Sequence, residues 1–271
     1  MCPAGSQVRR GGGNYFAIAL GVRVAGPARG TTDDASCLFL SYSRGRSEII
    51  ASHNGANDFR SGAQGLCAGM IDYTDRFLEG LQVIAAQLDR SRLNRMMDLL
   101  VDVRSVGGRV FFLGIGGGAA NASHAVNDFR KIAAIECYAP SDNVAELTAR
   151  TNDDGWESCY ANWLRVSRLS AQDAVFVFSV GGGSITQGIS TNIVRSLEFA
   201  TRVGARILGV VGRDGGFTAK VADACLIIPT VSEDTVTPLV ESFQAVVWHL
   251  IVSHPKLKVN EAKWESMPIL A

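Results

Sequence analysis

The chain has 271 residues, 47% of them hydrophobic, and its 26 Lys and Arg residues balance 26 Asp and Glu residues. This length is enough for a buried core, and zero formal net charge argues against wholesale binding to nucleic acid or to an anionic membrane. The six cysteines are scattered without a C-x-x-C pair, which is typical of reduced thiols in a cytosolic protein. No apolar run approaches the roughly 20 residues that cross a bilayer. We therefore expect a soluble, cytoplasmic protein that binds a small ligand.

Residues 1–69 differ from the rest of the chain. They contain the pair Arg9-Arg10, have no acidic residue before Asp33, and follow no sustained helical or strand period. Three interpretations stay open: a disordered extension, a transit-like leader rich in arginine, and translated sequence upstream of the real start. Met70 favours the third, because it immediately precedes the first regular helical pattern. We expect an irregular or disordered extension over 1–69 and one folded domain over 70–271.

The folded domain begins with apolar residues at helical spacing from Phe77 to Val103, which predict one or two amphipathic helices. Five segments that are apolar throughout then alternate with helical segments. These predicted strands are Val110 to Leu113, Ala133 to Cys137, Ala174 to Ser179, Arg206 to Val211 and Cys225 to Pro229. Continuous apolar strands are typical of a parallel sheet that crossover helices cover on both faces. With a last helix from Thr235 to Ser253, the sequence predicts a doubly wound α/β fold, a three-layer sandwich around five parallel strands.

Two of the predicted strands end in a glycine triplet at the start of a helix. The first turn is Gly114-Ile115-Gly116-Gly117-Gly118, and the second is Ser179-Val180-Gly181-Gly182-Gly183-Ser184. Glycine permits positive φ and close backbone approach, so that free N–H groups and the positive end of the helix can surround a phosphate. The hydroxyl groups that flank the second triplet suit a terminal phosphate monoester, which offers many acceptor oxygens.

Other interpretations of the two turns stay open. Gly114-x-Gly116-x-x-Ala119 also fits the dinucleotide fingerprint, with Glu136 near the end of the next predicted strand as the ribose-binding acid. The second turn has no role in a dinucleotide fold, which argues against that interpretation. Either triplet could also be only a tight connection between a strand and a helix.

Two predicted helices carry the residues that could perform acid–base chemistry. His124 and Asp128 are four residues apart and project from one helix face. Glu241 and His249 are eight residues apart on the last helix and lie roughly on a common side. These two imidazoles and two carboxylates could converge on one site. The alternatives are a helix-surface pair for His124 and Asp128 and a core position for His249.

Taken together, these motifs resemble the sugar isomerase (SIS) family, and within it most of all the phosphoheptose isomerases. The resemblance covers roughly residues 70–255. It rests on both glycine turns, on the Asn121-Ala122-Ser123-His124 segment and on the last helix. Two further segments carry it: Asn152-Asp153-Asp154-Gly155-Trp156 and Gly212-Arg213-Asp214-Gly215-Gly216.

The resemblance implies an aldose–ketose isomerase for a sugar phosphate, with sedoheptulose 7-phosphate of heptose biosynthesis as the expected substrate. It also implies a homotetramer with active sites between subunits and no organic cofactor. Asp128 and His249 stand where the family's carboxylate and histidine move protons between C1 and C2 through an enediol. The implied phosphate-binding residues are Ser179, Gly181, Gly182, Gly183 and Ser184, and the other substrate-binding residues are Gly116, Gly117, Gly118, Asp153 and Glu241.

The chain departs from the family at several of these positions. Asp128 stands for the usual glutamate, Glu241 for the usual glutamine, and Ile185-Thr186-Gln187-Gly188 follow the second turn as extra residues. Some members of the family carry zinc at this site. His124, Asp128, Glu241 and His249 offer two nitrogen and two oxygen ligands, a set that suits Zn²⁺.

Three functions stay open at this point. The first is the phosphosugar isomerase, which both turns together with Asp128 and His249 favour. The second is a non-catalytic SIS module that binds a phosphosugar or a protein partner, which the altered turns favour. The third is a nicotinamide-dependent oxidoreductase, which only the first turn and Glu136 favour.

Overall fold

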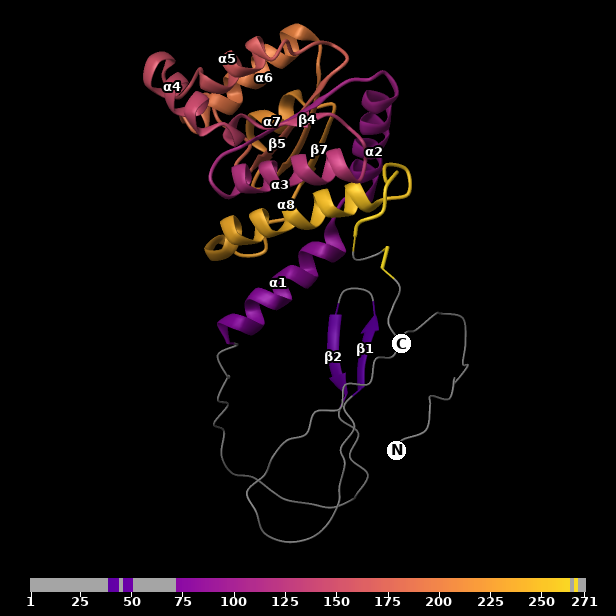
Figure 1. Cartoon of the computed structure of the whole chain (residues 1–271). Helices are drawn as coiled ribbons and strands as arrows, with labels where there is room; N and C mark the ends of the chain where they lie inside the picture. Colours follow the sequence, from indigo (N-terminus) through magenta and orange to yellow (C-terminus); the bar gives the residue numbers. More distant parts are fainter. Residues whose placement is uncertain (1–38, 44–45, 51–71, 264–265, 268–271) are drawn as a thin grey trace, which may run out of the picture. The chain divides into compact units, whose positions relative to one another are not determined.

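The computed structural model of the chain describes residues 39–43, 46–50, 72–263 and 266–267 (Figure 1). They belong to two units, residues 1–68 and 69–271. In the first unit, β1 (Phe39–Ser43) and β2 (Arg46–Ile50) form an antiparallel pair. No strand is predicted there from the sequence. The rest of the expected extension lies outside the described residues.

The second unit is built on one parallel sheet. Its strands are β3 (Val110–Gly114), β4 (Cys137–Tyr138), β5 (Ala174–Ser179), β6 (Arg206–Val211) and β7 (Ala224–Ile227). Their order across the sheet is β4-β3-β5-β6-β7, and every neighbouring pair is parallel. The predicted fold class, a five-stranded parallel sheet flanked by helices, is confirmed.

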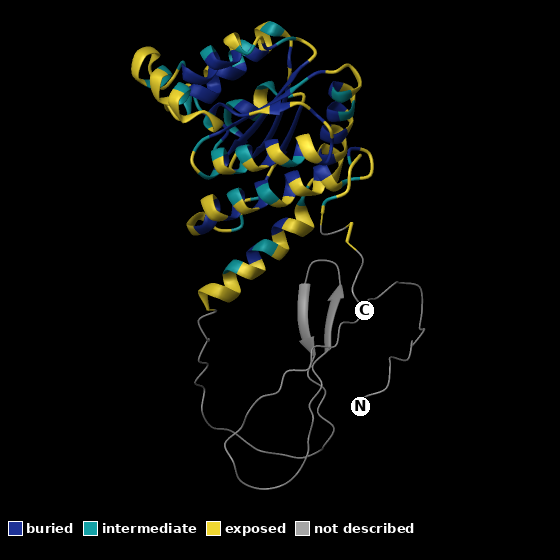
Figure 2. Ribbon diagram, in the orientation of Figure 1, coloured by how far each residue is buried: buried dark blue, intermediate teal, exposed yellow. Residues whose placement is uncertain are grey.

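Helices cover both faces of this sheet (Figure 1). On one side lie α1 (Tyr73–Gln87), α2 (Arg90–Ser105), α3 (Gly117–Lys131) and α8 (Val236–Ser253). On the other lie α4 (Val144–Asp154), α5 (Cys159–Val166), α6 (Thr191–Val203) and α7 (Gly216–Val221). Because side chains alternate along a strand, Phe112 and Phe176 enter the first core, whereas Phe111 and Val177 enter the second. The strands are therefore buried from both sides (Figure 2).

The predicted helical segment from Phe77 to Val103 is two helices. Asp89 separates them, because its carboxylate accepts hydrogen bonds from the backbone N–H groups of Ser91 and Arg92 and caps the start of α2. At the other end of the domain, residues 233–253 with α8 are long and apolar enough, by length and composition, to cross a membrane. However, 56% of the most apolar window of this segment is buried inside the protein, as in the core helix of a soluble protein.

The second predicted strand, Ala133 to Cys137, is wrong over most of its length. Strand β4 has only two residues, and Ala133 and Ile135 instead close the end of α3 through hydrogen bonds from their N–H groups to the Phe129 carbonyl. Their apolar character reflects burial beneath the helix end. Glu136 consequently precedes β4, and its carbonyl accepts from the N–H of Val110 at the start of β3. Glu136 therefore lies at the amino ends of the strands, whereas the first glycine turn follows the carboxyl end of β3. From this position Glu136 cannot act as the ribose-binding acid.

The strand order places the two glycine turns side by side. The chain forms β3, adds β4 on one side of it, and then crosses to form β5 on the other. The ends of β3 and β5 therefore flank the point where the strand order reverses, with Gly114 paired to Phe178. In open parallel sheets, ligands bind in the crevice at this point, beyond the carboxyl ends of the strands.

Candidate functional site

A pocket of about 1140 Å³ opens at this reversal point. The second glycine turn forms part of its wall: Ser179, Gly181, Gly183 and Ser184 all line it, whereas Gly182 does not. From the first turn, only Ile115 reaches the pocket. Four of the five predicted phosphate-binding residues thus share one cavity.

The second turn satisfies part of its own backbone and leaves part free. The N–H of Gly182 donates to the Ser179 hydroxyl at 3.0 Å, and the Gly182 carbonyl accepts from the N–H and the hydroxyl of Thr218. Within the described part of the chain, the N–H groups of Gly181 and Gly183 have no protein acceptor. Gly182 therefore holds the turn in place, while Gly181 and Gly183 present free donors at the pocket.

Residues 184–189 form a short loop that we call the tongue. The backbones of Ser184 and Ile189 bond to each other in both directions, at 2.9 and 3.1 Å, and close this loop. Ile185 and Ile189 are more than half exposed and line the pocket. The extra residues noted in the sequence therefore give the cavity an apolar wall.

Sequence reasoning missed the cations of this pocket. Arg213 and Lys220 both line it, Arg213 from the loop after β6 and Lys220 from α7. The Gly212 to Gly216 segment was noted only as a motif. Its position beside the second turn depends on the strand order, which the sequence does not reveal.

The first turn differs from the second because a protein carboxylate already lies over it. A Cβ built on Gly117 would lie 2.4 Å from the Cδ of Glu241, so only glycine leaves room for this carboxylate. Gly117 is the first residue of α3, where the helix dipole favours a negative charge. Gly118 is equally constrained, since its Cβ would lie 2.5 Å from the Phe178 carbonyl oxygen. Gly117 and Gly118 serve close packing at this end of α3, whereas Gly116 has a positive φ of 57° and open space around its Cβ position. None of the three lines the pocket.

Three of the four predicted acid–base residues come together between α3 and α8. The Asp128 Oδ2 atom lies 3.9 Å from the Nε2 atoms of both His124 and His249. The Asp128 side chain is 16% exposed, whereas those of the two histidines are about half exposed. We call His124, Asp128 and His249 the triad. It does not line the large pocket, and Asp128 lies about 16 Å along an ideal helix from Gly117.

Neighbouring groups fix the orientation of the triad. The Nδ1 atom of His249 lies 2.8 Å from the Ala245 carbonyl, to which it donates, and Nε2 faces Asp128. The other carboxylate oxygen, Oδ1 of Asp128, accepts from the Asn127 amide at 2.7 Å. Buried Trp248 packs edge-on against the His124 ring at 4.7 Å. Trp248 supports the triad, but nothing in the sequence distinguishes it from the other core residues of an apolar helix.

The triad fits a divalent metal ion. Its three ligand atoms lie within 4.8 Å of one another, and two imidazole nitrogens with one carboxylate oxygen are common Zn²⁺ ligands. A tetrahedral site with bonds of about 2.0 to 2.1 Å needs ligand atoms about 3.4 Å apart, a little closer than the separations here. Glu241 is not in this cluster, because its carboxylate lies over Gly117 instead. Asp153 also lies elsewhere, exposed in the last turn of α4, where it accepts from the Asn152 amide.

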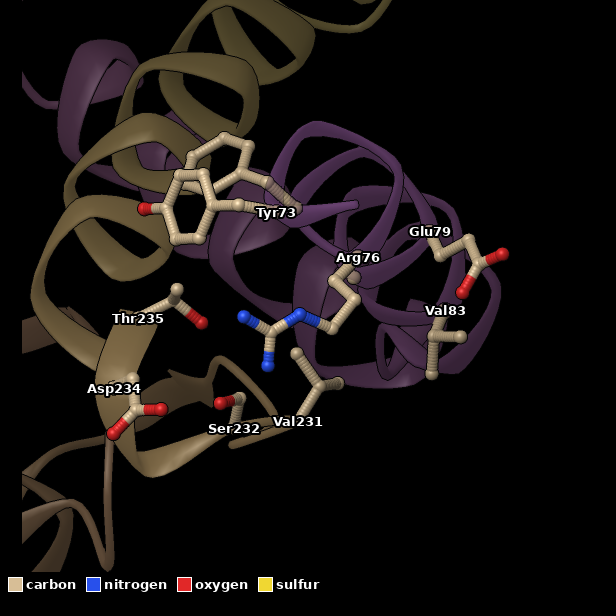
Figure 3. Close-up of a pocket in the computed structure, with 10 residues that line it drawn as sticks. Tyr73, Arg76, Glu79, Val83, Val231, Ser232, Asp234 and Thr235 are labelled. Carbon is tan, nitrogen blue, oxygen red and sulfur yellow. The ribbon is translucent and has the colours of Figure 1, made fainter. Parts of the chain in front are cut away.

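A second pocket, of about 420 Å³, lies between α1 and residues 231–235 (Figure 3). The Arg76 side chain reaches across it toward Ser232 and Thr235. None of the predicted site residues lines this pocket. The candidate site is therefore the larger pocket together with the triad.

Comparisons with known proteins agree with this architecture. No protein-family model matches the chain. The lincomycin biosynthesis protein LmbN of Streptomyces lincolnensis is 31% identical over 182 residues, which are 63% of this chain. The chain spans 64% of the length of LmbN. The phosphoheptose isomerase of Rhodospirillum rubrum is 31% identical over 150 residues, which are 54% of this chain and 74% of that protein.

Among solved structures, phosphoheptose isomerase GmhA from Neisseria gonorrhoeae superposes with a TM-score of 0.58. The alignment covers 66% of this chain and 94% of GmhA at 20% identity, so it concerns the fold alone. The identity to the Rhodospirillum rubrum protein extends this likeness to the sequence. The chain therefore belongs to the SIS family of sugar isomerases and is similar to its phosphoheptose isomerases.

Proposed function

We propose that this protein interconverts sedoheptulose 7-phosphate and D-glycero-D-manno-heptose 7-phosphate, a step of heptose biosynthesis. The observation that carries the proposal is the triad, in which the Asp128 carboxylate lies 3.9 Å from the Nε2 atom of His249. A carboxylate and a neutral imidazole side by side can accept and return protons near neutral pH. The large pocket with its glycine turn supplies a place for the phosphate.

The reaction needs two proton transfers. One group removes the proton from the carbon next to the carbonyl, and the other moves a proton between the two oxygens of the enediol. Asp128 and His249 divide these tasks. His249 is suited to receiving a proton at Nε2, because its bond to Ala245 fixes the tautomer. Trp248 and His124 hold the α3 side of the site in register with α8.

His124, Asp128 and His249 would hold a divalent ion such as Zn²⁺. When bound, the ion would polarise the sugar carbonyl and stabilise the negative charge that develops on its oxygen. The three side chains would then also orient the substrate's first two carbons. No organic cofactor is required by this chemistry.

The protein is further proposed to act as a cytoplasmic homotetramer with its sites between subunits. Within one chain, none of the three triad residues lines the pocket that the second turn helps to form. A substrate held by the second turn of one subunit and the triad of another would bring both parts together. This separation supports a shared site.

The test is turnover of sedoheptulose 7-phosphate by the purified protein, followed by NMR with and without added Zn²⁺. We expect conversion by the wild type, and a loss of about 10²- to 10⁴-fold for His249→Ala. Because His249 is half exposed, this variant should keep its circular dichroism spectrum and unfolding midpoint. No conversion under either condition, or equal rates for both proteins, would overturn the proposal. Saturable binding without turnover would instead identify a non-catalytic SIS module.

A further inference from the structure

Arg213 lines the large pocket, and its backbone adopts a left-handed conformation with φ of 53°. Few residues other than glycine do so. The loop around it is tied to the second glycine turn by a hydrogen bond from the Gly212 N–H to the Val180 carbonyl, 3.0 Å long. This fixed backbone directs the Arg213 side chain toward the second turn: its Cδ atom lies 4.0 Å from the place where a Cβ on Gly181 would be.

The charges around Arg213 leave its guanidinium available. Among residues 72–263, no carboxylate forms an ion pair with it. The carboxylate next in sequence, that of Asp214, instead accepts from the N–H of Gly216 at 3.1 Å. Lys220, the other cation of the pocket, lies about one helical turn beyond Gly216 on α7. Arg213 is therefore a cation without a protein counter-ion in the described residues, and its stem lies beside Gly181 of the second turn.

The guanidinium and the backbone donors complement one another. Gly181, over which the Arg213 stem lies, is also one of the two residues whose N–H groups are free. A planar guanidinium donates two parallel hydrogen bonds to a phosphate, and free backbone N–H groups can bind the remaining oxygens. Such an arrangement favours a dianionic phosphate monoester over a neutral sugar, because charge-assisted hydrogen bonds from a guanidinium to a phosphate are stronger than those to neutral hydroxyl groups.

We propose that Arg213 is a specificity-determining residue that binds the terminal phosphate of the substrate, together with the N–H groups of Gly181 and Gly183. This inference rests on the proposed function, which supplies the sugar phosphate as the substrate. The site selects for phosphorylated over unphosphorylated sugars. Arg213 binds and orients the substrate, and takes no part in moving protons.

The test compares Arg213→Gln with Arg206→Gln. Arg206 is the matched control, because it lies at the opposite end of β6 and pairs with Asp223 at the surface. Binding of inorganic phosphate is measured by calorimetry at constant ionic strength. We expect Arg213→Gln to weaken phosphate binding by about tenfold or more, and Arg206→Gln to leave it unchanged. Arg213→Lys keeps the charge without the planar fork, and should lose less than Arg213→Gln.

The kinetic readout separates binding from catalysis. For sedoheptulose 7-phosphate, Arg213→Gln should raise KM by about tenfold or more, with little change in kcat. The preference for the phosphorylated sugar over sedoheptulose should fall by the same factor. Unchanged phosphate affinity and KM in Arg213→Gln, or equal losses in Arg206→Gln, would overturn the inference while leaving the isomerase intact. If no sugar phosphate is turned over, Arg213-dependent phosphate binding would still support the inference, although the proposed reaction had failed.

Discussion

The Glu241 carboxylate on α8 rests directly against Gly117 on α3, where the Cδ atom of Glu241 lies 2.4 Å from the position of a Cβ on Gly117. A hydrogen bond from the Asn121 amide to the Glu241 carbonyl, 3.0 Å long, joins the same two helices. The carboxylate thus lies beside the start of α3, where the helix dipole favours a negative charge. Of the two glycine turns, only the second contributes glycines to the lining of the large pocket.

Replacing Gly117 by alanine should displace the Glu241 carboxylate without unfolding the protein. The φ of Gly117 is not in the left-handed region, and alanine is favoured over glycine in a helix by about 1 kcal/mol. We expect Gly117→Ala to lower kcat/KM for the sugar phosphate while the free energy of unfolding changes by no more than about 1 kcal/mol. In a Glu241→Ala background, Gly117→Ala should cause no further fall in kcat/KM. Fully additive losses in the double variant would show that the two residues act independently.

Zinc titration should distinguish the triad from Glu241. His124→Ala removes a ligand and should weaken Zn²⁺ binding by more than the roughly 10- to 100-fold that loss of a supporting partner costs. Glu241→Ala should leave the affinity unchanged, because Glu241 is outside the cluster. His254→Ala is the histidine control, since His254 lies beyond the end of α8. Similar losses in the His124 and His254 variants would contradict a metal site at the triad.

Acid sensitivity should depend on Asp173, whose side chain is 2% exposed. Burial raises the pKa of this carboxyl, but hydrogen bonds from Arg109 and Ser170 outweigh burial and hold the pKa below its ordinary value. The folded protein thus binds this proton less tightly than the unfolded chain. The resulting stabilisation is complete above the unfolded pKa of about 4 and is lost as the pH falls through the lower folded value.

Asp173→Asn should therefore reduce the free energy of unfolding at pH 7 by about 2 to 3 kcal/mol and flatten its fall below pH 4. Urea unfolding at several pH values measures both effects. The control is Asp98→Asn, which removes a half-exposed pair with Lys256 and should cost no more than about 1 kcal/mol. A variant of Asp173 that loses stability by the same amount at pH 3 as at pH 7 would contradict the assigned cause.

The tongue should influence substrate affinity more than stability. Ile185 is 59% exposed at the pocket wall, so Ile185→Ser should leave the unfolding midpoint unchanged. If the side chain contacts the sugar's carbon skeleton, its loss should raise KM by about tenfold. Val144→Ser on α4 is the control for an exposed apolar residue away from the pocket, and should change neither quantity. An unchanged KM for Ile185→Ser would mean that the tongue does not touch the substrate.

The fold was largely predictable because strands that are buried on both faces consist of apolar residues. Strands β3, β5 and β6 are apolar on both faces, so their existence and parallel arrangement could be inferred. Strand β4 could not be located, because Ala133 and Ile135 are buried at a helix end and look like strand residues. The three described cysteines, Cys137, Cys159 and Cys225, are buried free thiols as expected, and burial raises the pKa of each.

The candidate site was predictable where spacing along one helix decides geometry, as for His124 and Asp128. The approach of His249 from α8 required the resemblance to a family, because nothing in the sequence gives the packing of two helices. Arg213 and the position of Glu241 over Gly117 could not be foreseen. Both depend on which loops and helices become neighbours, and that is decided by the strand order.

The contact between Gly182 and Gly215 carries a consequence for engineering. A Cβ on Gly182 would lie 2.0 Å from the Gly215 carbonyl oxygen, and a Cβ on Gly216 would lie 2.2 Å from the Gly181 carbonyl oxygen. The backbones of the two loops therefore pack directly against each other. No side chain lies between them that could move to make room for a substitution. Anyone who grafts this phosphate-binding loop onto another scaffold, or exchanges it with that of a relative, must transplant the loop after β6 along with it.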